Sequence, residues 1–173
     1  YEIEQIRKHM DELGIKTLPI VSITGFIIGL VLAMQTQPVL VRFGAEAFLP
    51  GSVGISIVRE LGPVITALIF AGRVSSGIGA ELGSMRVTEQ IDAMEVSGTN
   101  PYKYLVATRV LATTFMIPIL VVLADAVSLY GGFLGTNIKG VVSWDLFWSQ
   151  VFDSLAFGDV VPSLLKTFLF GFA

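Results

Sequence analysis

The sequence predicts an all-α, polytopic integral membrane protein. Hydrophobic residues make up 53% of the 173 residues and charged residues only 14%, whereas soluble domains typically carry about 25% charged residues. The mean hydropathy is +0.77, and residues 17–41 include no ionisable side chain. A helix needs about 20 apolar residues to cross the hydrocarbon core, so this run is long enough for one crossing.

The first residues predict an amphipathic helix. Ile3, Ile6, Met10 and Leu13 recur at spacings of three and four and therefore share one helix face, with charged residues on most of the rest. Because this segment leads directly into the first span, we expect residues 1–16 to lie in the membrane interface. The alternative is a soluble helix packed on a partner. Residues 17–173 then form the transmembrane domain.

Two spans are expected in the first half of the chain. The first covers about Leu18 to Val39, and its Gly25 and Gly29 would let another helix approach closely. The second covers about Gly51 to Ser76 and contains Gly62-Pro63. Proline should kink this helix, and the carbonyls that it frees need partners within the protein or beside a cavity. A further stripe of small residues is expected to pack closely: Gly72, Ser76, Gly79 and Gly83.

Residues 84–104 are polar and predict a short helix outside the hydrocarbon, from Glu89 to Ser97. Thr88 is the expected N-cap, and Gly98 and Pro101 mark the end. The helix places two apolar residues on one side and three acidic residues on another: Glu89, Ile91, Asp92, Met94 and Glu95.

The third span is expected from about Tyr104 to Gly131, with a kink at Pro118 and with Asp125 toward its far end. Gly131 and Gly135 offer a second pair for close helix approach. A fourth span begins near Val160 and is cut short where the sequence stops in an apolar run, so we expect a fragment of a longer chain.

Basic residues indicate the orientation. Those near the N-terminus and in the second connector outnumber those on the opposite side: Arg7, Lys8, Lys16, Arg86 and Lys103 against Arg42 and Lys139. This asymmetry places residues 1–16 and 84–104, and with them the N-terminus, in the cytoplasm.

Arg59 and Glu60 lie inside the second span, and Lys166 lies at a similar depth in the fourth. An ionised group in hydrocarbon costs roughly 2.5–3.5 kcal/mol on insertion scales, so such groups usually face a cavity, a partner charge or a polar ligand. One interpretation is a structural Glu60–Lys166 ion pair that orients two helices. The other is a cavity that receives an anionic headgroup, because the planar fork of arginine suits phosphate.

Several function classes are excluded. The chain has no cysteine and a single histidine, His9, so no metal site is expected. The net charge of −3 and the lack of a basic cluster argue against a nucleic-acid partner. No P-loop or hydrolase motif is present. The chain should therefore be no enzyme and hold no cofactor, and any ATP would be hydrolysed by a separate subunit.

Two long motifs resemble the MlaE/YrbE family, the permease subunits of ABC transporters that work with MCE proteins. They are Arg59-Glu-Leu-Gly-Pro-Val-Ile-Thr-Ala-Leu-Ile-Phe-Ala-Gly-Arg73 and Gly79-Ala-Glu-Leu-Gly-Ser-Met-Arg-Val-Thr-Glu-Gln-Ile-Asp-Ala-Met-Glu95. The resemblance implies a homodimeric permease with five spans in the bacterial inner membrane, so that this chain lacks part of the fourth span and all of the fifth.

The resemblance also implies partners and roles. The helix at about residues 89–97 would be the coupling helix that docks on an MlaF-type ATPase, which an MlaB-type STAS protein supports. An MlaD-type MCE hexamer would lie on the other face. The substrate would be phospholipid, and Arg59, Glu60 and Lys166 match family positions at the lipid pocket.

Two other functions remain open from the residues alone. The chain could be an ion- or proton-coupled secondary carrier in which Glu60 titrates, because intramembrane carboxylates serve in proton relays. It could also be a membrane anchor that holds a partner assembly without transporting anything. Co-purification with an ATPase separates the permease from the carrier.

Overall fold

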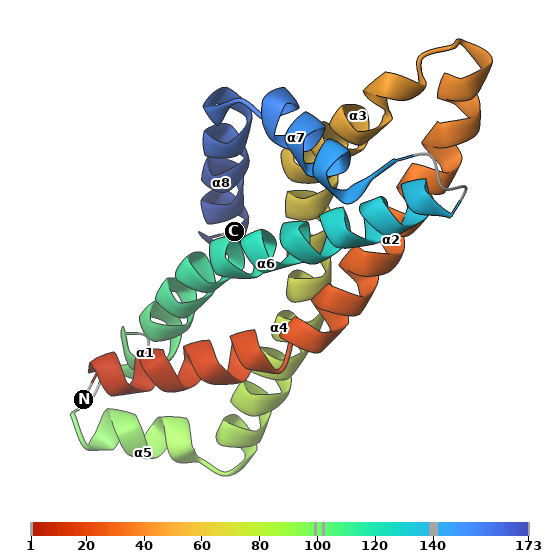
Figure 1. Cartoon of the computed structure of the whole chain (residues 1–173). Helices are drawn as coiled ribbons and strands as arrows, with labels where there is room; N and C mark the ends of the chain where they lie inside the picture. Colours follow the sequence, from red (N-terminus) through yellow and green to blue (C-terminus); the bar gives the residue numbers. More distant parts are fainter. Residues whose placement is uncertain (1, 99, 102, 139–141, 173) are drawn as a thin grey trace.

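The computed structural model describes residues 2–98, 100–101, 103–138 and 142–172, and this part of the chain is helical without strands (Figure 1). Three helical segments are long and apolar enough to cross a membrane: Asp11–Arg42, Glu46–Val87 and Tyr104–Asn137. A fourth crossing is possible only if α7 and α8 count as one span, although the two helices are bent by 76° relative to each other. The predicted all-α membrane fold is therefore confirmed.

The N-terminal segment forms α1, Glu2–Met10, followed by a π-helical turn at Asp11–Ile15 and then α2, Leu18–Arg42. The buried Thr17 joins them, because its hydroxyl donates to the carbonyl of Leu13 at 2.6 Å. The first span therefore begins where the sequence predicts and continues slightly past the expected end.

The second span consists of α3, Leu49–Ser56, a π-helical turn, Ile57–Leu61, and α4, Gly62–Val87. The helix continues well beyond the predicted end at Ser76. Its extension changes the role of Thr88, whose hydroxyl donates to the carbonyl of Ser84 and closes α4 instead of capping the next helix. The prediction of an N-cap at Thr88 is therefore wrong.

The helix α5, Gln90–Val96, follows after a sharp turn. Glu89 makes this turn with a left-handed backbone, φ 55°, and supplies no side-chain cap. The rest of the described chain contains a π-helical turn at Lys103–Ala107, α6, Thr108–Asn137, α7, Trp144–Ser154, and α8, Phe157–Phe172.

Glycines bring α2 and α6 into backbone contact. A Cβ on Gly25 would lie 2.7 Å from Ser128 Oγ, and one on Gly135 would lie 2.7 Å from the carbonyl oxygen of Leu30. Cβ atoms on Gly29 and Gly131 would overlap backbone atoms of the facing helix. Both predicted close-approach pairs are therefore confirmed, and they face each other.

The predicted stripe on α4 behaves differently. A Cβ on Gly72, Gly79 or Gly83 would meet no other described atom within 4 Å, and Ser76 is exposed. Within this chain the stripe therefore packs against no described helix, because α6 and α8 contact α4 elsewhere. Close packing of these residues against another copy of the chain stays a prediction.

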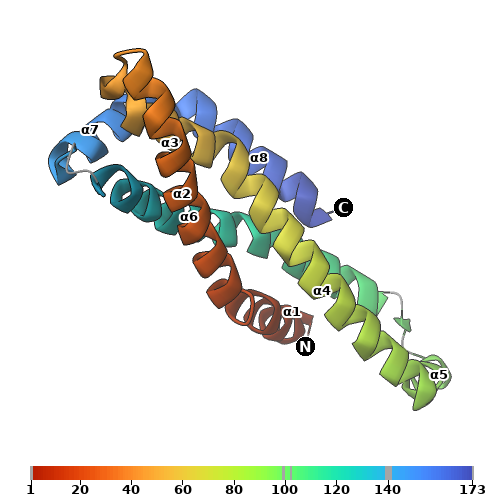
Figure 2. The same ribbon diagram turned by 90° about the vertical axis from the view of Figure 1, so that its right-hand side faces the viewer.

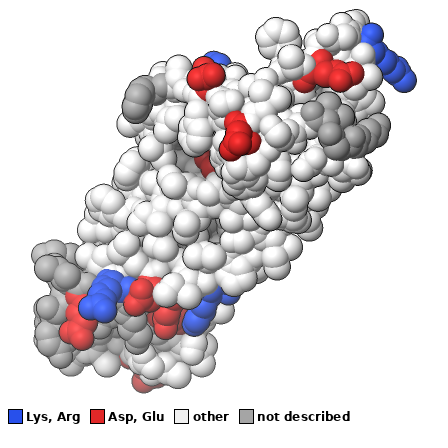
Figure 3. All heavy atoms as spheres, viewed as in Figure 1, with Lys and Arg blue, Asp and Glu red and all other residues white. Residues whose placement is uncertain are grey.

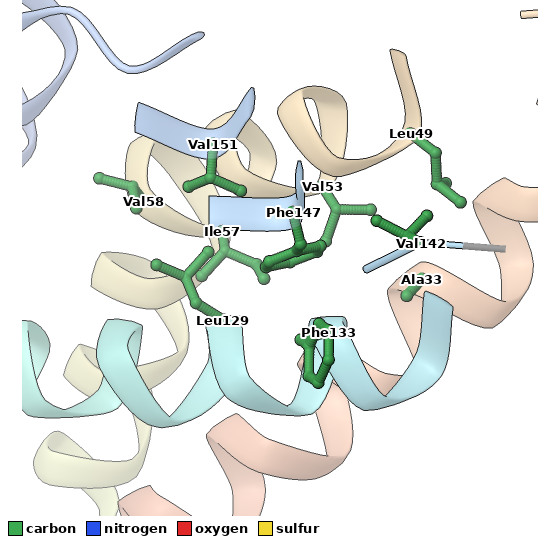
Figure 4. Close-up of a cluster of buried hydrophobic side chains, with 10 residues drawn as sticks. All are labelled: Ala33, Leu49, Val53, Ile57, Val58, Leu129, Phe133, Val142, Phe147 and Val151. Atoms are coloured by element: carbon green, nitrogen blue, oxygen red, sulfur yellow. The ribbon is translucent and has the colours of Figure 1, made fainter. Parts of the chain in front are cut away.

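The largest buried cluster joins α3, α6 and α7 (Figure 4). Phe147 and Val151 of α7 are fully buried against Val53 and Ile57, and the ring of Phe133 meets that of Phe147 edge-on at 5.5 Å. This packing holds α3 and the first residues of the π-helical turn in place.

The two ends of the molecule differ in what they carry. α1 and α5 lie at one end, and α3 and α7 lie at the other (Figures 1 and 2). On the face shown in Figure 3, charged side chains gather toward both ends and leave an uncharged band between them. For the described residues of 1–16 and 84–104 the predicted grouping at one end is confirmed, and their cytoplasmic side stays a prediction. Lys139 lies outside the described residues.

Candidate functional site

The π-helical turn at Ile57–Leu61 carries both intramembrane charges of the second span, and Pro63 accounts for its hydrogen bonding. The amide of Gly62 donates to the carbonyl of Ile57, five residues back. The next donor in this register would be residue 63, but proline has no N–H. The carbonyl of Val58 therefore loses its partner within the helix.

Ser163 of α8 supplies the missing donor. Its hydroxyl donates to the carbonyl oxygen of Val58 at 2.7 Å, and the side chain is buried, with 2% of the residue exposed. The prediction that the proline-freed carbonyl finds a partner within the protein is confirmed. α8 is thereby fixed against the π-helical turn. Such turns are often found at functional sites.

Arg59 projects from this turn with 58% of its side chain exposed. Its Nη1 lies 3.6 Å from Oδ1 of Asp159, close enough for an ion pair but too long for a direct hydrogen bond. Among the described residues the side chain of Arg59 donates no hydrogen bond. Its guanidinium therefore has several N–H donors available for a ligand.

Glu60 and Lys166 are both exposed. The described residues show no ion pair between them within 4.0 Å, and the ion pair that joins the two elements is Arg59 with Asp159 instead. An ion pair thus joins the second span to α8, but it is Arg59–Asp159 and not the Glu60–Lys166 pair considered from the sequence.

Sequence reasoning missed Asp159 and Ser163. Both lie on the same face of α8 as Lys166, since the three positions follow a spacing of four and three. That spacing was visible in the sequence, but nothing local indicated which face of α8 meets the second span. Only the fold supplies that information.

Asp125 of α6 is a further intramembrane carboxylate beside the turn. Its Oδ1 is buried without a hydrogen-bond partner in the described part of the chain, and a Cβ on Gly62 would overlap this oxygen. The absence of a side chain at Gly62 is therefore what makes room for the carboxylate next to the π-helical turn.

The other predicted functional element, α5, projects from the end of α4. Asp92 forms an ion pair with Arg86, and Ile91 and Met94 are half-buried. Glu89 and Glu95 are exposed. The helix therefore presents an acidic outer face while its apolar side and one ion pair hold it on the long span.

Comparison with known proteins identifies the family. The family model described as Permease MlaE matches residues 6–173, which is nearly the whole chain. The chain belongs to the MlaE permease family. It is a multi-pass membrane protein, in agreement with its apolar helices.

The relatives of this MlaE-family chain carry related names. A probable ABC transporter permease protein of Rickettsia typhi is 41% identical over 92% of this chain and 62% of the relative. The intermembrane phospholipid transport system permease protein MlaE of Haemophilus influenzae is 39% identical over 98% of this chain and 68% of the relative. A chloroplast protein of Arabidopsis thaliana, trigalactosyldiacylglycerol 1, is 29% identical over 95% of this chain and 47% of its own length.

These shares show how much of a relative the MlaE-family chain represents. It spans about three fifths of the length of several of the curated relatives that it matches. The π-helical turn, its partner helix α8 and the short helix α5 all lie within the matched residues.

Proposed function

We propose that this chain is the transmembrane permease subunit of an ABC transporter that moves phospholipid between the bacterial inner membrane and a periplasmic MCE-protein carrier. Family membership supports this proposal, as does the phospholipid transport named for the relative from Haemophilus influenzae. We also propose that the N-terminus lies in the cytoplasm. The asymmetry of basic residues supports this orientation, and α1 and α5 lie at the same end of the molecule.

One observation carries the proposal: the side chain of Arg59 is largely exposed on a membrane-spanning helix and donates no hydrogen bond to the described residues. Exposure to acyl chains would cost several kcal/mol. The cost falls if this surface faces a water-filled chamber or a polar ligand. A second copy of the chain would provide the facing wall, so we expect a homodimer with the chamber at its centre.

Phosphate is the ligand chemistry that suits Arg59. A guanidinium can donate two parallel hydrogen bonds to phosphate oxygens. Asp159 contacts Nη1 of Arg59 from one side at 3.6 Å, which orients the group without occupying its donors. In this proposal Arg59 binds the lipid phosphate, while Glu60 and Lys166 set the remaining charge of the chamber.

Energy would come from an MlaF-type ATPase supported by an MlaB-type STAS protein. The docking element is α5, whose acidic residues Glu89 and Glu95 are exposed and whose ion pair Arg86–Asp92 attaches it to α4. The chain would hold no cofactor of its own. An MlaD-type MCE hexamer would cover the opposite end and receive the lipid.

The test uses the full-length permease purified with its partner subunits. Arg59→Ala should reduce the phospholipid that co-purifies and slow lipid transfer between labelled vesicles. Arg42→Ala is the matched control, because it removes an exposed arginine from the end of a span. Equal lipid content and transfer in the two variants would refute the role of Arg59.

A second measurement tests the coupling role separately. Glu95→Arg reverses a charge on the exposed side of α5 and should weaken association with the ATPase, measured by co-purification. The phospholipid bound to the permease itself should not change. Unaltered association would exclude Glu95 from the docking surface.

A further inference from the structure

A polar pocket lies between the N-terminal segment, α4 and α6, and its lining residues on α4 run from Arg73 to Glu81. This part of α4 leads to the end of the molecule that carries α1 and α5, away from the π-helical turn (Figure 2). Its volume is about 290 Å³, close to the lower end of the roughly 300–1,000 Å³ typical of small-molecule pockets. The N-terminal segment, α4 and α6 form its walls. The charged residues among those lining it are Glu12, Lys16, Arg73, Glu81 and Arg109.

Arg109 is the most deeply buried of these residues, with 5% exposed. Its Nη2 lies 2.9 Å from Oε2 of Glu81, and its Nη1 donates to the carbonyl of Leu105 at 2.9 Å. Its Nε is buried and has no hydrogen-bond partner among the described residues. A buried donor without a partner costs about 1–3 kcal/mol, so one donor of this guanidinium is unused in the wall of the pocket.

Two further cations, Arg73 and Lys16, line the same pocket without a carboxylate partner. Arg73 is half-buried and donates from Nη1 to the backbone carbonyl of Lys16. Within the described residues neither side chain has an acidic group within 4.0 Å. Since Glu81 is committed to Arg109, the exposed Glu12 is the other acid available to balance them.

The pocket therefore carries an excess of positive charge and has unused N–H donors. Two guanidinium groups and one ammonium group suit an oxyanion, and guanidinium in particular suits the tetrahedral oxygens of phosphate. The location also matters, because the pocket lies beside a helix that is expected to rest in the membrane interface. Headgroup phosphates occupy that depth of a bilayer.

We propose that the pocket between the N-terminal segment, α4 and α6 binds a phosphate group, held by Arg73, Arg109 and Lys16. The phosphate can come from the headgroup of an anionic lipid in the adjacent leaflet or from a free phosphate ion. This site is separate from Arg59, and the proposal does not depend on lipid binding there.

The experiment uses the full-length permease carrying Arg59→Ala, so that lipid held at the π-helical turn does not contribute. Dioleoylphosphatidylglycerol and inorganic phosphate are titrated separately, and bound copies are counted by native mass spectrometry. Arg73→Gln should weaken binding of the phosphate-bearing probe at least fivefold. Arg7→Gln removes the same charge from the exposed face of α1 and should change the dissociation constant less than twofold.

The two probes distinguish the sources. Binding of phosphatidylglycerol that excess inorganic phosphate does not displace supports a lipid headgroup, while saturable binding of inorganic phosphate supports a free ion. Lys16→Gln provides a second variant on another wall of the pocket and should act in the same direction as Arg73→Gln. Binding of neither probe, or equal weakening by Arg73→Gln and Arg7→Gln, would overturn the proposal.

Discussion

The hydrogen bond from Ser163 to the carbonyl of Val58 gives the sharpest test of how the charged turn is held. Ser163→Ala removes the hydroxyl that lies 2.7 Å from this buried carbonyl oxygen. Since Pro63 has no N–H, the helix cannot supply a replacement donor. The lost bond then leaves an unsatisfied buried acceptor, which costs about 1–3 kcal/mol.

This cost should appear as a fall in thermal stability. For a chain of 150–250 residues, a loss of about 2 kcal/mol lowers the melting temperature by roughly 4–8 °C. The assay is thermal unfolding of the full-length permease in detergent. Ser149→Ala is the matched control, because its hydroxyl donates to the carbonyl of Leu146 on an exposed surface. A substitution of that kind usually changes stability by no more than about 0.5 kcal/mol.

A double-mutant cycle isolates the physical cause. In a Pro63→Ala background the new N–H can donate to the freed carbonyl, so Ser163→Ala should cost at least about 1 kcal/mol less than in the wild-type background. Equal costs in the two backgrounds would show that Ser163 stabilises the protein by packing alone. A Ser163→Ala variant as stable as Ser149→Ala would refute the reasoning altogether.

Three further predictions follow from the packing and the ion pair. Gly29→Ala should destabilise the full-length permease by about 1–3 kcal/mol in thermal unfolding, because the methyl group overlaps the backbone of α6. Gly72→Ala is the control: its methyl group meets no described atom within 4 Å, and alanine favours the helix, so it should be neutral or slightly stabilising. Phe147→Ala should cost about 3–5 kcal/mol in the same assay, because a fully buried ring leaves a cavity. Asp159→Asn removes the charge beside Arg59 and should raise the amount of co-purified phospholipid, and a decrease would show that Asp159 helps to hold the ligand.

Much of the fold was predictable because a membrane-spanning helix is recognised from the composition of its own segment. The spans from Leu18 and near Tyr104 follow directly from long apolar runs. The glycine pairs at 25 and 29 and at 131 and 135 also follow from spacing, because only residues without side chains let two backbones touch. Helix ends were less certain, as α4 shows by continuing to Val87.

The candidate site was predictable only in part. Arg59 and Glu60 were evident because charge is rare within a span. Their surroundings were not, since the donor to Val58 comes from a residue 105 positions further along the chain. Thr88 failed as a predicted N-cap for a related reason. Its hydroxyl has two carbonyls of the preceding turn within reach, and the sequence does not decide between closing one helix and opening the next.

The unbroken length of α4 has a mechanical consequence. Its 26 residues extend over roughly 39 Å at 1.5 Å per residue, so a tilt of about 5° at one end displaces the other by roughly 3 Å. The tight turn at Glu89 and the ion pair between Arg86 and Asp92 attach α5 closely to the end of α4. If α5 docks on an ATPase as proposed, a push on α5 would therefore move the neighbourhood of Arg59 sideways by ångströms, which is about the difference between making and breaking a hydrogen bond to a ligand oxygen.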